Sequence, residues 1–109
     1  MKIQEEKKGK VLVLKLDGEL MGGDDSKPFQ EAIYKSIREG VTQVVVDMAR
    51  VQWMNSSGLG LLMAALTTLR SSEGDLKLAN VPDRVKRPIQ ITKLDQVIED
   101  FRADWVAHC

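Results

Sequence analysis

The sequence predicts an α/β domain with a mixed, mostly parallel β-sheet, an N-terminal hairpin and α-helices packed against the sheet. Short apolar segments typical of strands alternate with segments in which apolar residues recur at offsets of three and four. Helices of crossover length separate most of the strands, as parallel pairing requires. The 109 residues, 43% of them hydrophobic, fit one compact domain, so we expect residues 1–109 to form a single unit.

The chain begins with a predicted hairpin. Ile3 to Lys7 is a strand candidate, and Gly9-Lys10 turns it into a second strand from Val11 to Asp17. Alternation along the second strand predicts one apolar face, which consists of Leu12, Leu14 and Leu16.

A helix is predicted after this hairpin. The segment Gly22-Gly23-Asp24-Asp25-Ser26 interrupts the strand pattern and offers capping residues, and Pro28 falls near the first helical turn. Gly40 is expected to end the helix. The apolar face of the helix consists of Phe29, Ala32, Ile33 and Ile37.

The middle of the chain combines a strand with a long helix. Val44 to Val46 is a β-branched run, typical of a strand covered on both faces, and Asp47 is expected to end it. After a short loop, a helix is predicted from about Ser57 to Ser72, which places Ser56 and Ser57 at its cap. The apolar stripe of this helix consists of Leu59, Leu62, Met63, Leu66 and Leu69.

The last third of the chain repeats the alternation. Gly74 marks the end of the long helix, and Leu76 to Ala79 is the next predicted strand. Pro82 starts a third helix, which Pro88 should shorten or kink because proline removes a backbone hydrogen bond. Two further elements are expected near the end: a short strand from Val97 to Phe101 and a helical turn from Asp104.

The two serines before the long helix allow two interpretations. A serine hydroxyl at a helix start can simply accept an unpaired backbone N–H, which stabilises the helix by about 1 kcal/mol. Alternatively, Ser56 or Ser57 is a phosphorylation site, because the N–H groups and the macrodipole at a helix N-terminus favour an added anion. Capping alone does not separate these interpretations.

The segment from Met54 to Gly60, MNSSGLG, follows a valine-rich strand and resembles the signature of the STAS domain, as in bacterial anti-sigma-factor antagonists. The resemblance extends over nearly the whole chain. The sequence departs from the family pattern at Asn55, where Asp is common, at Lys93, where Gly is usual, and at Pro88. The supporting landmarks are Gly18-Glu19-Leu20, Gly74 to Leu78, Val85-Lys86-Arg87 and Thr92-Lys93-Leu94.

The resemblance implies a phosphorylation-switched binding module. Unmodified, it would bind an anti-sigma factor with serine kinase activity and release a sigma factor, and a serine phosphatase is a further expected partner. Ser56 is the implied phosphate acceptor because it matches the first serine of the family motif. The expected partner-binding surface consists of Met54, Ser56, Ser57, Gly58 and Leu59, with Asp24 and Asp25 in the loop beside it.

Alternatives remain at the level of the sequence. The same fold could serve as a scaffold or transport-system subunit that binds one constant partner without a phosphoswitch. Trp53 and Met54 could anchor a partner or could pack in the core. Gly58 could form part of the binding surface, or its small size could let the helix start close to the preceding loop.

Catalytic chemistry is not expected. A serine nucleophile needs a positioned base, but His108 is the only histidine and stands next to the last residue. The sequence has neither a nucleophile elbow nor a phosphate-binding glycine loop, and no Cys/His cluster has metal-ligand spacing. The adjacent carboxylates, Glu5-Glu6 and Asp24-Asp25, are typical of solvated turns. We therefore expect no enzyme activity, no cofactor and no metal.

Charge and hydropathy restrict the partners further. The 16 basic and 16 acidic residues cancel, so nucleic-acid binding is not expected. No apolar run approaches the length of a membrane span, and the polar start MKIQEEKKGK does not resemble a signal peptide. We expect a cytoplasmic protein. Cys109, the single cysteine, cannot form an internal disulfide and is assigned no role.

Overall fold

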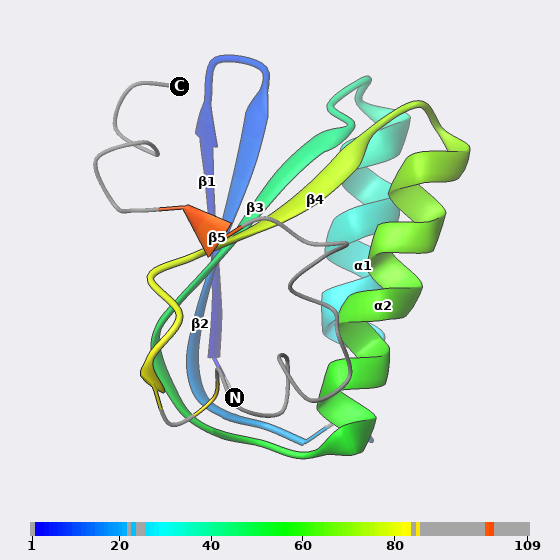
Figure 1. Ribbon diagram of the computed structural model, residues 1–109. Helices are drawn as coiled ribbons and strands as arrows, with labels where there is room; N and C mark the ends of the chain where they lie inside the picture. Colours follow the sequence, from blue (N-terminus) through cyan, green and yellow to red (C-terminus); the bar gives the residue numbers. More distant parts are fainter. Residues whose placement is uncertain (1, 22, 24–25, 84, 86–99, 102–109) are drawn as a thin grey trace.

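The computed structural model describes residues 2–21, 23, 26–83, 85 and 100–101, which form one five-stranded sheet with two helices on it (Figure 1). The strand order is β1-β2-β3-β4-β5. β1 and β2 pair antiparallel, and every other neighbouring pair is parallel, so the predicted mixed sheet with an N-terminal hairpin is confirmed. The elements are β1 Lys2–Lys8, β2 Val11–Leu20, α1 Ser26–Arg38, β3 Gln43–Met54, α2 Ser56–Ser71, β4 Asp75–Ala79 and β5 Asp100–Phe101.

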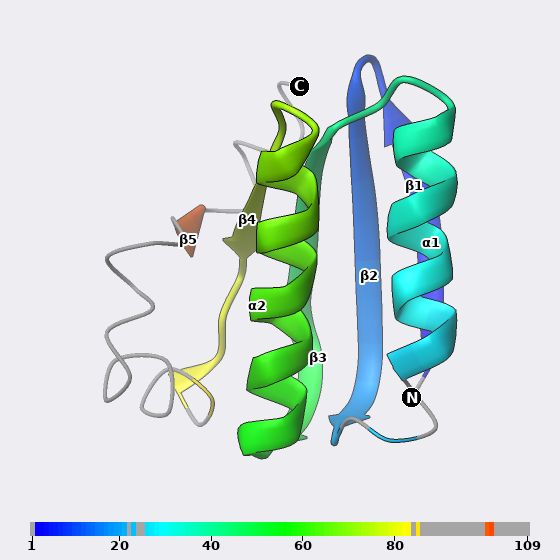
Figure 2. The ribbon, with the colours of Figure 1, turned by 90° about the vertical axis from the view of Figure 1, so that its right-hand side faces the viewer.

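Both helices cover the same face of the sheet (Figure 2). α1 connects β2 to β3 and α2 connects β3 to β4, and the strands follow one another in a single direction across the sheet. Right-handed crossovers in one direction place successive helices on one face. The core lies between the helices and this face.

The predicted apolar faces meet in this core. Two residues of the predicted apolar faces are only half-buried: Met63 of α2 and Ile37 of α1. The remaining predicted positions are buried: Leu12, Leu14, Leu16, Phe29, Ala32, Ile33, Leu59, Leu62, Leu66 and Leu69. On the other face of the sheet, Val13, Val45 and Ala79 form a second buried cluster, so the central strands are covered on both faces, as the valine run predicts.

Each helix ends in a left-handed residue. Gly40 has φ 83° and follows α1, where its N–H donates to the Ile37 carbonyl at 2.9 Å. After α2 the left-handed residue is Glu73, with φ 63°, and not the predicted Gly74. Gly74 has another reason to be glycine: a Cβ there would collide with the carbonyl oxygen of Thr42.

The prediction that the third strand ends at Asp47 is wrong. Pairing with β4 ends there, but β3 continues beside β2 until Met54 pairs with Leu20. The register between β2 and β3 shifts twice along this stretch, so β3 contains β-bulges that interrupt its alternation. Asp47 Oδ1 accepts the Ala49 N–H at the first shift, at 3.0 Å. The broken period made this half of the strand resemble a loop.

The last third is described in part. β4 agrees with the predicted strand, and β5 covers two residues of the strand predicted from Val97 to Phe101. Most of the predicted third helix, including Pro88, lies outside the described residues. The same holds for Lys93 and for the turn predicted from Asp104. No helix among the described residues combines the length and the apolar character needed to cross a membrane.

α2 begins in contact with the end of β2. A Cβ placed on Gly58 would collide with the carbonyl oxygen of Leu20, whereas a Cβ on Gly60, two residues later in the same helix, would meet no atom within 4 Å. The absence of a side chain at Gly58 therefore permits the close approach of helix and strand.

Substituting Gly58→Ala should therefore lower the free energy of unfolding by about 1–3 kcal/mol, because backbone or helix must shift to relieve the overlap. Gly60→Ala is the matched control and should raise it by about 0.5–1 kcal/mol, as expected for an unobstructed helical glycine. Chemical denaturation of the two variants tests this. Equal effects of the two substitutions would contradict the proposed close contact.

Candidate functional site

The N-terminus of α2 is capped by Asn55. Its backbone is extended, with φ −104° and ψ −177°, and its side-chain oxygen accepts the N–H of Gly58 at 2.8 Å. Its carbonyl accepts the N–H of Leu59 at 3.0 Å. The prediction that Ser56 and Ser57 form the cap is therefore corrected: Asn55 is the cap, and the serines are the first two residues of the helix.

Both serines are exposed on this first helical turn. The turn contains no acidic residue. Backbone N–H groups in the first turn of a helix lack partners within the helix, and together with the macrodipole they favour negative charge. The site can thus accommodate an anionic group on Ser56 or Ser57, because no carboxylate in the turn would repel it.

The other predicted surface residues separate into buried and exposed positions. Gly58 is buried, as are Leu59 and Met54, whose exposed fractions are 7% and 3%. The expectation that these three lie on the exposed surface is corrected: all of them are buried, and Met54 and Leu59 belong to the core. Trp53, by contrast, is exposed, with 54% of its surface accessible to solvent.

The end of β2 lies beside the serines. The N–H of Asn55 donates to the carbonyl of Leu20 at 3.4 Å, and Met21, the next residue, is exposed. This contact supports the expectation that the loop after β2 begins next to the start of α2. Asp24 and Asp25, the predicted contacts in that loop, lie outside the described residues.

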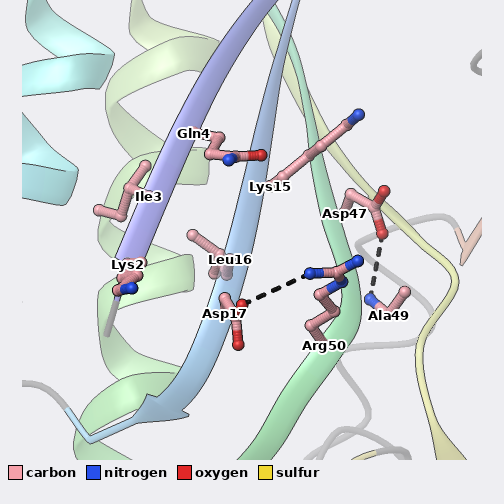
Figure 3. Close-up of a pocket in the computed structure, with 9 residues that line it drawn as sticks. All are labelled: Lys2, Ile3, Gln4, Lys15, Leu16, Asp17, Asp47, Ala49 and Arg50. Atoms are coloured by element: carbon pink, nitrogen blue, oxygen red, sulfur yellow. Dashed lines mark hydrogen bonds and ion pairs between the residues drawn. The ribbon is translucent and has the colours of Figure 1, made fainter.

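A separate pocket of about 720 Å³ lies where β1, β2 and β3 run side by side (Figure 3). Two of its charged groups form ion pairs: Arg50 lies 3.8 Å from Asp17, and Lys15 lies 3.0 Å from Glu6, which is not part of the pocket lining. The hydrogen bond from Lys15 holds the pKa of the Glu6 carboxyl below its usual value. Sequence periodicity gave no signal for this pocket, whose lining combines residues from three strands.

Neither location holds a metal-binding cluster among the described residues. Within the described part of the chain, no group of three or more His, Cys, Asp or Glu side chains could hold a metal ion. His108 lies outside that part. What the site at α2 offers is a pair of exposed hydroxyl groups at a capped helix start.

Comparison with known proteins identifies similar domains. An anti-sigma-B factor antagonist from Listeria monocytogenes is 35% identical over 63 residues, which cover 58% of this chain and 54% of that protein. The match thus spans about half the length of this curated relative.

Two solved structures share the fold. The anti-sigma factor antagonist SpoIIAA in its unphosphorylated form has a TM-score of 0.82 at 24% identity, covering 97% of this chain and 93% of SpoIIAA. The Bacillus cell fate determinant SpoIIAA in its phosphorylated form has a TM-score of 0.77 at 23% identity, covering 98% and 97% of the two chains. At these identities the likeness is one of fold.

The family assignment extends over almost all of the sequence. The profile of the STAS domain matches residues 2–106, a range that includes the sheet, both helices and the serine motif. It confirms the resemblance seen in the segment from Met54 to Gly60. The chain therefore belongs to the STAS domain family.

Proposed function

We propose that this chain is an anti-sigma-factor antagonist whose binding is switched by phosphorylation of Ser56. In its unmodified form it binds an anti-sigma factor with serine kinase activity in the cytoplasm, and a sigma factor is released. The kinase transfers a phosphoryl group from ATP to the Ser56 hydroxyl oxygen, and the modified protein binds poorly. A serine phosphatase restores the hydroxyl.

One observation carries the proposal: an exposed hydroxyl stands at the first position of a helix that another residue caps. Because Asn55 makes the bond to Gly58, the Ser56 hydroxyl has no capping role to lose on modification. A phosphate there would meet the positive end of the helix dipole. Phosphorylation can therefore change the surface without removing a structural contact.

Asn55 also affects the electrostatics of the switch. An aspartate at this cap would place a negative charge beside the phosphate, whereas the Asn55 amide is neutral and makes the same cap bond. The first turn of α2 holds no other acidic residue. A phosphate dianion on Ser56 is thus less opposed here than beside an acidic cap.

The names of similar proteins support the regulatory part of the proposal. The Listeria relative is an anti-sigma-B factor antagonist, and SpoIIAA has been solved both unphosphorylated and phosphorylated. The proposal gives this chain a binding role and no catalytic one. A scaffold with one constant partner would use the same fold but would carry no phosphate on Ser56, which intact-mass measurement of the native protein distinguishes.

Substituting Ser56→Ala should block phosphorylation and keep the partner bound permanently. We expect the free energy of unfolding to change by less than about 0.5 kcal/mol, because no cap bond is lost. Asn55→Ala, the matched control, should lose about 1 kcal/mol because it removes the cap. Denaturation titrations compare the two. To identify the acceptor, the Ser56→Ala and Ser57→Ala variants are each incubated with ATP and the purified serine-kinase anti-sigma factors of the source organism, and the phosphate incorporated into each variant is measured.

The acceptor assignment is wrong if Ser56→Ala incorporates phosphate at the normal rate and Ser57→Ala does not.

Phosphorylated and unmodified protein should have nearly the same thermal midpoint but differ at least about 10-fold in affinity for the anti-sigma factor, or about 1.4 kcal/mol. The helix N-terminus tolerates the charge, whereas a partner surface shaped for a neutral hydroxyl does not. Calorimetric melting and binding titration of both forms measure this. A much lower melting point of the phosphoprotein would show that the switch works by unfolding instead.

A further inference from the structure

We infer that Trp53 is the apolar anchor of the surface through which this chain binds its anti-sigma factor, an inference that rests on the proposed function. Among the described residues, three large hydrophobic side chains are exposed: Met21 by 37%, Tyr34 by 49% and Trp53 by 54%. Met21 and Trp53, which we call the apolar edge pair, both belong to the end of the sheet next to Ser56. Tyr34 lies on α1.

The strand register brings both members of the apolar edge pair to the same end of the sheet. Trp53 of β3 lies opposite Glu19 of β2, and Met54 lies opposite Leu20, so Met21 follows directly after the last paired residue. Side chains alternate along a strand, and Met54 points into the core under the helices. Trp53 therefore points away from that core, and its ring is available to another molecule.

The distance to the phosphorylation site is short. Ser56 follows Trp53 by three positions in the chain, so their Cα atoms are at most about 11 Å apart. A protein surface that buries about 800 Å² of each partner is roughly 30 Å across. An anti-sigma factor that covers Ser56 can therefore also reach Trp53.

A single exposed apolar side chain is common on protein surfaces and needs no explanation. Here two large exposed apolar side chains belong to the same end of the sheet. The other exposed positions in the same half of β3 are Ala49, Arg50 and Gln52, and none of them carries a large apolar side chain. Tryptophan, with tyrosine and arginine, is enriched among the residues that dominate the binding energy of protein interfaces. The anti-sigma factor should accordingly offer an apolar cleft that accepts the planar ring, next to the surface that reads the Ser56 hydroxyl.

Affinity measurements test this anchor. Trp53→Ala should weaken binding of the unmodified protein to its anti-sigma factor at least about 10-fold, whereas Trp53→Phe should stay within about 3-fold of the original. Tyr34→Ala is the matched control for loss of an exposed aromatic ring and should change affinity less than about 2-fold. The binding partners in these measurements are the purified serine-kinase anti-sigma factors of the source organism, each tested separately. Equal affinities of the Trp53→Ala and Tyr34→Ala variants would overturn the inference.

A spectroscopic measurement locates the ring without relying on a destabilised variant. The chain is labelled with 5-fluorotryptophan, and the Trp53 resonance is assigned by its loss in Trp53→Phe. Adding the unlabelled anti-sigma factor should shift this ¹⁹F resonance and remove its H₂O/D₂O solvent isotope effect. An unchanged resonance in a saturated complex would show that Trp53 stays in solvent, and the inference would fail.

The outcomes separate the inference from the function on which it rests. If the unmodified chain binds an anti-sigma factor, loses affinity on Ser56 phosphorylation and is indifferent to Trp53→Ala, the proposed function stands and the anchor is wrong. If none of the purified anti-sigma factors binds the unmodified chain, the proposed function fails, and the anchor fails with it.

Discussion

The contact between Gly58 and the backbone of Leu20 fixes the geometry of this end of the molecule. The carbonyl of Leu20 accepts the N–H of Asn55, and it also occupies the space that a Cβ of Gly58 would need. One backbone oxygen thus touches both the cap residue and the first turn of α2. Because the start of α2 is held against the end of β2, the Ser56 hydroxyl has a defined position on the surface. Any function assigned to the serines depends on this close approach.

The path of β3 provides the second constraint. The strand pairs with β4 only as far as Asp47 and then follows β2 alone, and its β-bulges accompany that change. Asp47 Oδ1 accepts from Ala49 N–H and from Asn80 Nδ2, at 3.0 and 3.2 Å, so it joins the bent strand to the residue after β4. Bulges bend a strand and re-aim its side chains. Beyond the bulges, Met54 enters the core and Trp53 faces solvent.

Sequence periodicity predicted the regular elements and failed where the backbone is irregular. Alternation in β2 and the three-and-four spacing in α2 identified buried residues correctly, because each element keeps one period. The second half of β3 was mistaken for a loop because its bulges break the period of two. At the cap, Asn55, Ser56 and Ser57 are all good capping residues, and the structure distinguishes Asn55 by its extended backbone and by the hydrogen bond that its side chain accepts from Gly58. Whether Trp53 is buried could not be predicted, since a single bulge reverses the face of every later side chain.

If Ser56 is the phosphate acceptor, as we propose, the fact that Asn55 and not Ser56 caps α2 has a mechanistic consequence. A serine that both capped α2 and accepted phosphate would lose its cap bond on modification, and the switch would then be coupled to helix stability. Here the cap bond runs from Gly58 to Asn55, so the neighbouring hydroxyl can gain roughly −1.5 to −2 charges while that bond stays intact. Behind it, Leu59 and Met54 remain packed in a core that the added charge does not enter. Such an arrangement confines a change at Ser56 to the surface, where it can alter binding and leave the fold in place.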